Sequence, residues 1–152
     1  MASQHVDFLI VGQGLAGSAL AWQLIEAGQR VVVIDNDHRS AASRVAAGLI
    51  NPLAGMRFNR RPEVGSWLRS AESWYNTLAR RFGQRVFHPR PMLRLFRSAE
   101  QRRFYARRRN DPDARNLLGE TFSANNCPEQ ITAPHGGFIQ YQTGYVDLPL
   151  LL

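Results

Sequence analysis

Three glycines and one acid near the N-terminus have the spacing of a phosphate-binding turn. Gly12, Gly14 and Gly17 form the pattern GxGxxG, and Asp35 follows Gly17 by 18 positions. The first glycine of this pattern allows a tight turn, the second lets backbone approach a pyrophosphate, and the third lets a helix pack closely on a strand. An acid about 20 positions later hydrogen-bonds a ribose hydroxyl. These residues predict a dinucleotide site, and the acid disfavours an NADP-type ligand.

The residues around the turn predict the elements that must position it. The apolar run at residues 8–11 predicts a buried parallel strand, and residues 31–34 predict a second strand that ends at Asp35. Between them, apolar and small residues recur at helical spacing up to a stop at Gly28: Ala16, Ala19, Leu20, Leu24 and Ile25. The start of this helix faces the turn, where free N–H groups and the helix dipole attract a diphosphate. The alternative is a βαβ unit that binds no nucleotide.

A second stretch, at residues 36–55, is rich in small residues and predicts an extended loop with one short helical turn. Ser43 and Arg44 have side chains that can hydrogen-bond a diphosphate. Ala46, Ala47 and Gly48 would let a flat ring system approach the backbone without side-chain collision. The alternative is a solvent-exposed linker.

The composition is that of a globular chain of 152 residues, 44% of them hydrophobic. No stretch reaches the length of a membrane helix and no cleavable leader is evident, so we expect a cytoplasmic protein. The single cysteine, Cys127, excludes an internal disulfide and is expected to be buried or incidental. The histidines show no ligand spacing, so no metal site is predicted: His5, His38, His88 and His135.

The net charge of +7 is concentrated in the middle of the chain. All 19 basic residues are arginines, and residues 57–115 hold 16 of them against 5 acids. Such a block can pair with the phosphates of nucleic acid, and the segment RRFYARRR at residues 102–109 is the best support for that partner. However, the arginines are scattered through amphipathic segments and no nucleic-acid-binding module accompanies them, so a solvated surface is favoured.

The remaining residues predict further helices and strands. Helical spacing over residues 64–82 predicts an amphipathic helix with its aromatic residues in the core: Trp67, Trp74, Tyr75 and Phe82. Residues 86–97 alternate in a way that predicts one strand. Ser98 and Gln101 resemble a capping box that opens a helix through about Arg109. Two short strands are expected around Thr143 and Gly144, followed by a helix capped by Asp147.

The stretches VGQGLAGSALAWQLIEAGQRVVVID and SAASRVAAGLINPLAG together resemble the FAD-dependent oxidoreductases of the D-amino acid oxidase and glycine oxidase (DAO) superfamily. The second stretch discriminates, since NAD-dependent Rossmann enzymes have no such element there. The resemblance implies FAD as cofactor. It also implies a chain that is the N-terminal portion of a longer enzyme, which agrees with an apolar end, LPLLL, that needs something to pack against.

The resemblance assigns cofactor-binding residues by position. Besides the three glycines and Asp35, the set is Leu15 and Ala16 at the diphosphate turn, Asn36 at the ribose, Ala42, Ser43 and Arg44 along the diphosphate, and Ala47, Gly48 and Leu49 beside the isoalloxazine. Catalytic residues do not carry over. In the superfamily they come from the later part of the chain, so we expect them beyond Leu152.

The expected fold is α/β, with a Rossmann-like βαβ unit and part of a second, α+β substrate lobe. We expect residues 1–56 to belong to the FAD-binding domain, residues 57–142 to the arginine-rich substrate lobe, and residues 143–152 to a segment returning to the FAD domain. The implied function of the full-length protein is oxidation of the C–N bond of an amine or amino acid by hydride transfer to flavin. The 152 residues alone are expected to be inactive.

Two alternatives remain open. One is a flavin enzyme that modifies wobble uridine of tRNA, which would give the arginine block a partner. The other is an NAD-binding dehydrogenase or a nucleotide-binding module built on the same βαβ unit.

Overall fold

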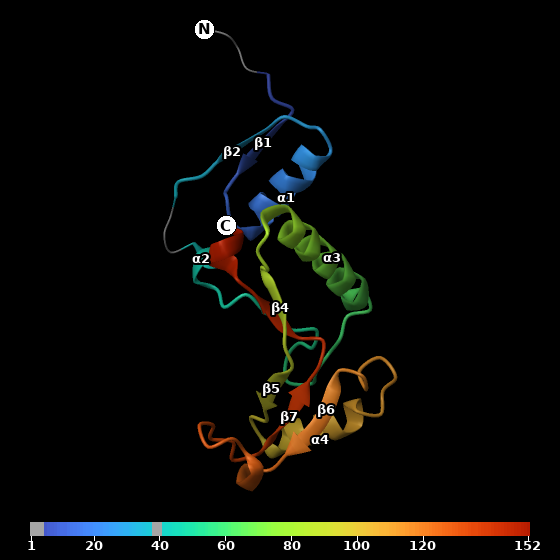
Figure 1. Cartoon of the computed structure of the whole chain (residues 1–152). Coiled ribbons are helices and arrows are strands. Elements are labelled where there is room, and N and C mark those ends of the chain that lie inside the picture. Colours follow the sequence, from blue (N-terminus) through green and yellow to red (C-terminus); the bar gives the residue numbers. More distant parts are fainter. Residues whose placement is uncertain (1–4, 38–40) are drawn as a thin grey trace. The chain divides into compact units, whose positions relative to one another are not determined.

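The computed structural model describes residues 5–37 and 41–152 and divides the chain into two compact units (Figure 1). The first unit comprises residues 1–48 and 146–152, and the second comprises residues 49–145. The expected domain ends near residues 56 and 142 both fall inside the second unit. This is because β3 (Leu49–Ile50) pairs with β8 (Gly144–Val146) and ties these two segments together.

The first unit is a parallel strand pair with one long helix. β1 (Phe8–Val11) pairs with β2 (Val31–Ile34), with Phe8 opposite Val31 and Val11 opposite Ile34. The connecting helix α1 (Leu15–Glu26) packs on both strands. Two one-turn helices complete the unit, α2 (Ala42–Val45) and α5 (Leu148–Leu151). The strand, turn, helix and strand predicted from residues 8–35 are therefore confirmed.

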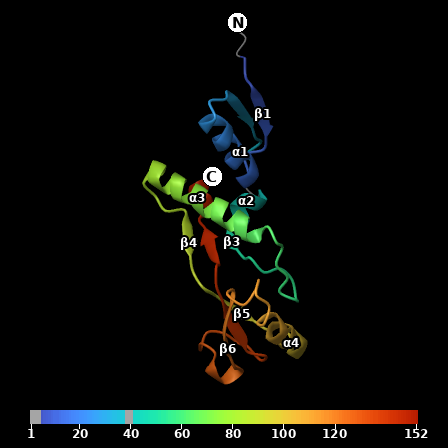
Figure 2. The same ribbon diagram turned by 90° about the vertical axis from the view of Figure 1, so that its right-hand side faces the viewer.

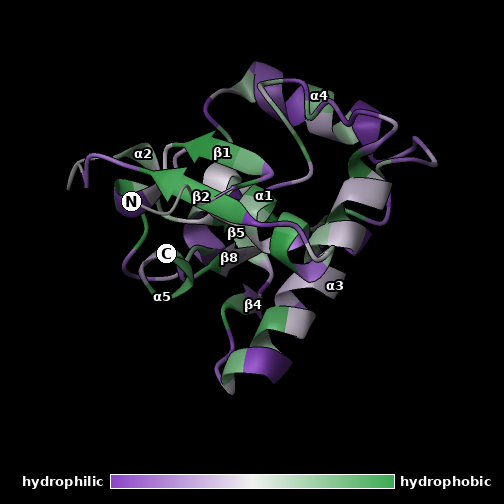
Figure 3. Ribbon diagram, turned by 90° about the horizontal axis from the view of Figure 1, so that it is seen from above, coloured by the Kyte–Doolittle hydropathy of each residue, from purple (hydrophilic) through white to green (hydrophobic). Residues whose placement is uncertain are grey.

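The strands of the first unit have more apolar surface than the unit covers. Ile10 and Ala21 are buried, but Leu9, Val11 and Ile34 are exposed. Figure 3 shows β1 and β2 coloured as hydrophobic along their length. Such a composition is typical of a parallel strand that is buried on both faces of a sheet.

The second unit contains two three-stranded sheets. In one, β8 lies between β3 and β4 (Phe87–Pro89). In the other, β7 (Gly137–Gln140) pairs antiparallel with β5 (Met92–Leu95) and β6 (Leu118–Phe122). The helices are α3 (Val64–Phe82), α4 (Ala99–Arg108) and a short 3-10 helix, η1 (Ala124–Asn126). α3 lies beside β4 in both Figure 1 and Figure 2.

An aromatic cluster forms the core of the second unit. Phe138 is fully buried, and its ring lies within 5.5 Å of the ring centroids of Phe58, Phe96 and Tyr105. Aliphatic residues close the cluster: Leu53, Ala114, Leu117 and Leu118. The unit thus buries large side chains supplied by its own strands, loops and α4.

Predicted ends of several helices are confirmed by their caps. Ser98 Oγ accepts a hydrogen bond from the Gln101 N–H at the start of α4, and Asp147 Oδ1 accepts one from the Leu150 N–H at the start of α5. Gly83, in the left-handed region at φ 69°, ends α3.

Two expectations are wrong in detail. The single strand expected at residues 86–97 is two strands in different sheets, because Pro91 lies between β4 and β5 and proline has no N–H to donate. The aromatic residues of α3 are not all in the core: Tyr75 is buried, whereas Trp67 is 54% and Phe82 is 62% exposed. The apolar stripe is therefore narrower than the aromatic content suggests.

Candidate cofactor site

Gly12 and Gly17 make the turn after β1 possible through backbone geometry. Gly12 adopts φ +99°, in the region that favours glycine. A Cβ atom built on Gly17 would lie 1.9 Å from the Gly12 carbonyl oxygen, so any side chain there would force the turn open. The Gly12 N–H also donates to the Ile34 carbonyl, which ties the turn to β2.

The N-terminus of α1 presents backbone N–H groups at this turn. Gly14 is the N-cap residue and supplies no side-chain cap. The first bond of the helix runs from the Ser18 N–H to the Gly14 carbonyl oxygen, so the N–H groups of Ala16 and Gly17 precede it and have no acceptor within the helix. With the dipole of a helix of 12 residues behind them, they form a site for an anion.

Ser43 brings a hydroxyl to the same place. Its Oγ accepts a hydrogen bond from the Leu15 N–H at 3.0 Å, although the two residues are 28 positions apart. A Cβ atom on Gly14 would lie 3.1 Å from this oxygen, so the glycine gives α2 room to approach the start of α1. A hydroxyl that accepts one hydrogen bond still has a proton to donate, and a phosphate oxygen can accept it.

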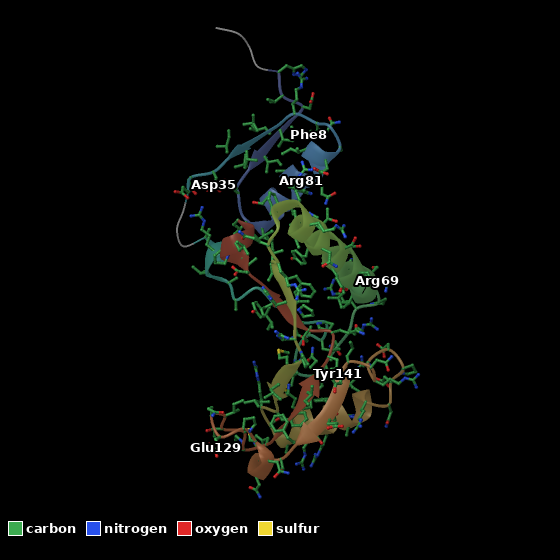
Figure 4. All side chains as sticks on the ribbon, viewed as in Figure 1. Phe8, Asp35, Arg69, Arg81, Glu129 and Tyr141 are labelled. Carbon is green, nitrogen blue, oxygen red and sulfur yellow. The ribbon has the colours of Figure 1, made fainter. Side chains whose placement is uncertain are left out.

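Asp35 is held at the carboxyl end of β2 by two backbone N–H groups. Its Oδ2 accepts from the Gln13 N–H at 2.6 Å, and its Oδ1 accepts from the Asp37 N–H at 2.7 Å. Figure 4 labels Asp35 at this end of the strand. An ionised carboxylate only accepts hydrogen bonds, which suits it to the hydroxyl groups of a ribose.

Arg44 forms an ion pair on the surface of the first unit. Its guanidinium pairs with Asp37 at 2.9 Å, and both side chains are substantially exposed. An exposed pair of this kind contributes little to stability, and a phosphate could displace the carboxylate. Ala42 is the first residue of α2, and the Asn36 side chain is exposed after β2.

Comparisons with known proteins agree with this geometry. The family model described as FAD dependent oxidoreductase (DAO) matches residues 7–152. The chain belongs to this family of FAD-dependent oxidoreductases. The cofactor of this family is FAD, so the turn, Ser43 and Asp35 have to suit the chemical groups of FAD.

Individual relatives cover different shares of the chain. The uncharacterized oxidoreductase YurR of Bacillus subtilis (strain 168) is 38% identical over 54 residues, which cover 36% of this chain and 14% of YurR. Glycine oxidase from Bacillus cereus ATCC 14579 superposes with a TM-score of 0.71 at 18% identity, over 97% of this chain and 43% of its own. Iminodiacetate oxidase from Chelativorans sp. BNC1 superposes with a TM-score of 0.70 at 21% identity. The match covers 94% of this chain and 41% of the iminodiacetate oxidase chain. The chain spans less than half of each of these proteins.

The residues of the first unit fit FAD by their chemistry. A diphosphate needs hydrogen-bond donors, and the turn offers backbone N–H groups and the Ser43 hydroxyl. An adenosine ribose needs an acceptor, and Asp35 offers a carboxylate fixed in place. The close approach of backbone to phosphate needs positions without a Cβ atom, and Gly12, Gly14 and Gly17 provide them.

The residues expected beside the isoalloxazine have a structural role of their own. Gly48 adopts φ +63°, and a Cβ atom there would lie 2.0 Å from the Val146 carbonyl oxygen. The Val146 N–H donates to the Gly48 carbonyl at 2.9 Å, so this glycine is required where the returning segment joins the first unit. Ala47 is exposed beside it, and Leu49, the first residue of β3, is 57% exposed.

Sequence reasoning missed two participants. The Gln13 backbone N–H donates a hydrogen bond to the Asp35 carboxylate. The position of Gln13 between two glycines of the motif is the sequence feature that could have indicated this role. Val146 is almost 100 positions from Gly48, and no local pattern indicates their contact. Within residues 5–37 and 41–152, no cluster of three or more potential metal-ligating side chains is present, and no helix is long and apolar enough to cross a membrane.

Proposed function

We propose that the full-length protein oxidises the C–N bond of an amine or amino acid, using FAD held by the first unit. The observation that supports this is the convergence of the glycine turn, Ser43 and Asp35 at the start of α1 in a chain of the FAD dependent oxidoreductase family. The named structural relatives, a glycine oxidase and an iminodiacetate oxidase, favour a small amine or amino acid as substrate.

Each group of the first unit has a distinct role in this proposal. The N–H groups of Ala16 and Gly17 and the Ser43 hydroxyl bind the diphosphate, while Asp35 orients the adenosine ribose. When bound, FAD supplies the chemistry by accepting a hydride from the carbon that bears nitrogen, after which the imine hydrolyses. The side chains that meet the substrate are expected beyond Leu152.

The test begins with the absorbance spectrum of the purified full-length protein. A flavin spectrum, bleached under anaerobic conditions by an amine or amino acid from a substrate panel, is the expected result. The amine must be consumed with release of ammonia from a primary amine, or of the smaller amine from a secondary amine. A protein that cannot be reconstituted with FAD would contradict the proposal, and a flavoprotein reduced only by substrates without a C–N bond to oxidise would contradict its substrate class.

The arginines of α4 support one alternative, a flavin enzyme that acts on tRNA. Arg102, Arg103, Arg107 and Arg109 are all exposed in the structure. Electrophoretic shift of tRNA at physiological salt separates the two functions, because attraction confined to low salt is non-specific. A tRNA complex that survives at physiological salt would favour this alternative over a small-molecule oxidase.

The NAD-binding alternative is tested by thermal shift of the flavin-free protein. A ligand that binds the native state raises its apparent stability, so FAD is expected to raise the melting temperature more than NAD does. A larger increase with NAD would reverse this assignment.

We also propose that residues 1–152 alone neither hold FAD tightly nor turn over substrate. Among the described residues, the sheet of the first unit consists of the strand pair β1 and β2, with apolar side chains exposed on it. Ligand affinity requires burial of most of the ligand surface, and further strands would have to supply it. Stoichiometric yellow protein with amine-dependent turnover from this segment would contradict the expectation.

A further inference from the structure

A cavity of about 490 Å³ lies within the second unit, between α3 and strands β3 and β4. Its apolar wall includes Ile50, Leu68 and Phe87, and its polar wall includes Arg60, Arg69 and Glu72. This volume is in the range of small-molecule sites, which are apolar clefts with a few polar groups that fix orientation.

Two guanidinium groups converge on one glycine in this cavity. A Cβ atom built on Gly65 would lie 3.0 Å from Arg60 Nη2 and 3.6 Å from Arg69 Nη1. Both nitrogens are therefore within 4 Å of the same point, which is open because residue 65 has no side chain. Two cations this close repel each other unless an anion lies between them or nearby.

The cavity wall contains one carboxylate, that of Glu72, and among the described residues it is not within ion-pair distance of either guanidinium. No ion pair forms with Arg60 or Arg69 among these residues. Arg60 Nη1 donates to the Asp113 carbonyl oxygen at 2.7 Å, a neutral acceptor. Arg60 Nε is buried and has no hydrogen-bond partner. A buried donor without a partner is costly and rare, so the Arg60 guanidinium has fewer acceptors than it has donors.

We propose that this cavity binds a small carboxylate with an apolar body. The carboxylate accepts hydrogen bonds from Arg60 and Arg69, which are charge-assisted and therefore strong. The hydrocarbon part lies against Ile50, Leu68 and Phe87. Inorganic phosphate would match the charges but leave the apolar wall uncovered. The site consists of the second unit's own residues and does not rest on the proposed oxidation of amines.

The test is calorimetric titration of the full-length, FAD-bound protein with 4-methylpentanoate, its uncharged amide and inorganic phosphate. Arg69→Gln is the decisive variant because its side chain is exposed and holds no contact that folding needs. Arg81→Gln is the matched control, with the same loss of charge at the other end of α3, outside the cavity (Figure 4). We expect carboxylate affinity to fall at least about tenfold in Arg69→Gln and to be unchanged in Arg81→Gln.

The comparison of the two variants also controls for other carboxylate sites, because affinity lost in Arg69→Gln and kept in Arg81→Gln locates the loss near Arg69. Arg60→Gln is expected to weaken binding as well, and its melting temperature shows whether loss of the Asp113 contact has unfolded the unit. Equal carboxylate affinities of Arg69→Gln and Arg81→Gln would overturn the proposal. Amide binding as tight as carboxylate binding would overturn it too, and so would phosphate binding tighter than either.

Discussion

The two units of the molecule differ in how completely they bury their apolar side chains. The second unit closes a core of its own, in which Phe58 and Phe138 are completely buried. The first unit leaves Leu9 and Val11 of β1 exposed, and its turn after β1 is held by backbone and side-chain hydrogen bonds. If the first unit binds the cofactor as proposed, stability of the second unit and cofactor binding depend on separate parts of the chain, so a substitution should be able to remove one without the other.

The largest effect is expected in the core of the second unit. Phe138→Ala removes the ring at the centre of the aromatic cluster and should destabilise this unit by about 3–5 kcal/mol. Hydrogen exchange resolved by segment should show lost protection in β5, β6 and β7, with β1 and β2 unaffected. Phe82→Ala, at a position that is 62% exposed, is the matched control. Equal losses of exchange protection in both units would show that the units unfold together, which would contradict their separate stability.

The next effect is expected in the glycine turn. Gly17→Ala places a methyl group 1.9 Å from the Gly12 carbonyl oxygen, so the turn must shift at a cost of about 1–3 kcal/mol. The full-length variant should lose bound flavin after desalting while the second unit keeps its exchange protection. Gly28→Ala, at the other end of α1, is the control for backbone strain alone, because Gly28 adopts φ +77° but a Cβ atom there meets nothing within 4 Å. Retention of full flavin content by Gly17→Ala would contradict the proposed site.

A smaller effect is expected at Ser43. Ser43→Ala removes the hydroxyl that accepts from the Leu15 N–H and, in the proposal, donates to phosphate. Loss of one such hydrogen bond costs about 1 kcal/mol, so FAD should bind roughly fivefold to tenfold more weakly. Ser43→Thr keeps the hydroxyl and should restore most of the affinity. Equal weakening by both substitutions would point to a packing effect instead.

The smallest effect concerns the surface ion pair beside the strand pair. The side-chain hydrogen bonds from Arg30 lower the pKa of the Asp7 carboxyl below its usual range. A depressed pKa in the folded state means that the stabilisation is present above the unfolded-state pKa of about 3.9 and is lost as pH falls through the folded-state value. Asp7→Asn should slightly flatten the acid limb of the stability profile in urea unfolding. An unchanged acid limb would show that the pair contributes nothing.

Local patterns predicted the parts of the fold that local chemistry determines. Apolar runs, a glycine motif and caps such as Ser98 and Asp147 act within a few residues, and the corresponding elements were found where expected. β6 was missed because its sequence, LGETF, contains glycine and glutamate and becomes a strand by pairing with β7. Phe58 adopts φ 54° in the fully buried core, a conformation that tertiary packing imposes and no local pattern reveals.

In the candidate site, too, some features follow from local sequence and others from contacts between distant segments. The donors at the start of α1 and the acid at the end of β2 follow from the motif, because its spacing is set by one strand, one helix and a second strand. The contact between Gly48 and Val146 joins distant segments, so no local pattern indicates that this contact requires a glycine. The Arg60 and Arg69 pair likewise meets only because a loop and α3 fold together.

Competition among FAD, ADP and riboflavin for the flavin-free, full-length protein tests the central claim most directly. The claim is that affinity for FAD comes from the glycine turn, Ser43 and Asp35, which bind diphosphate and ribose. In a calorimetric titration, ADP should compete with FAD, and riboflavin, which lacks both groups, should bind far more weakly than FAD. Riboflavin binding as tight as that of FAD, with no competition from ADP, would contradict the account.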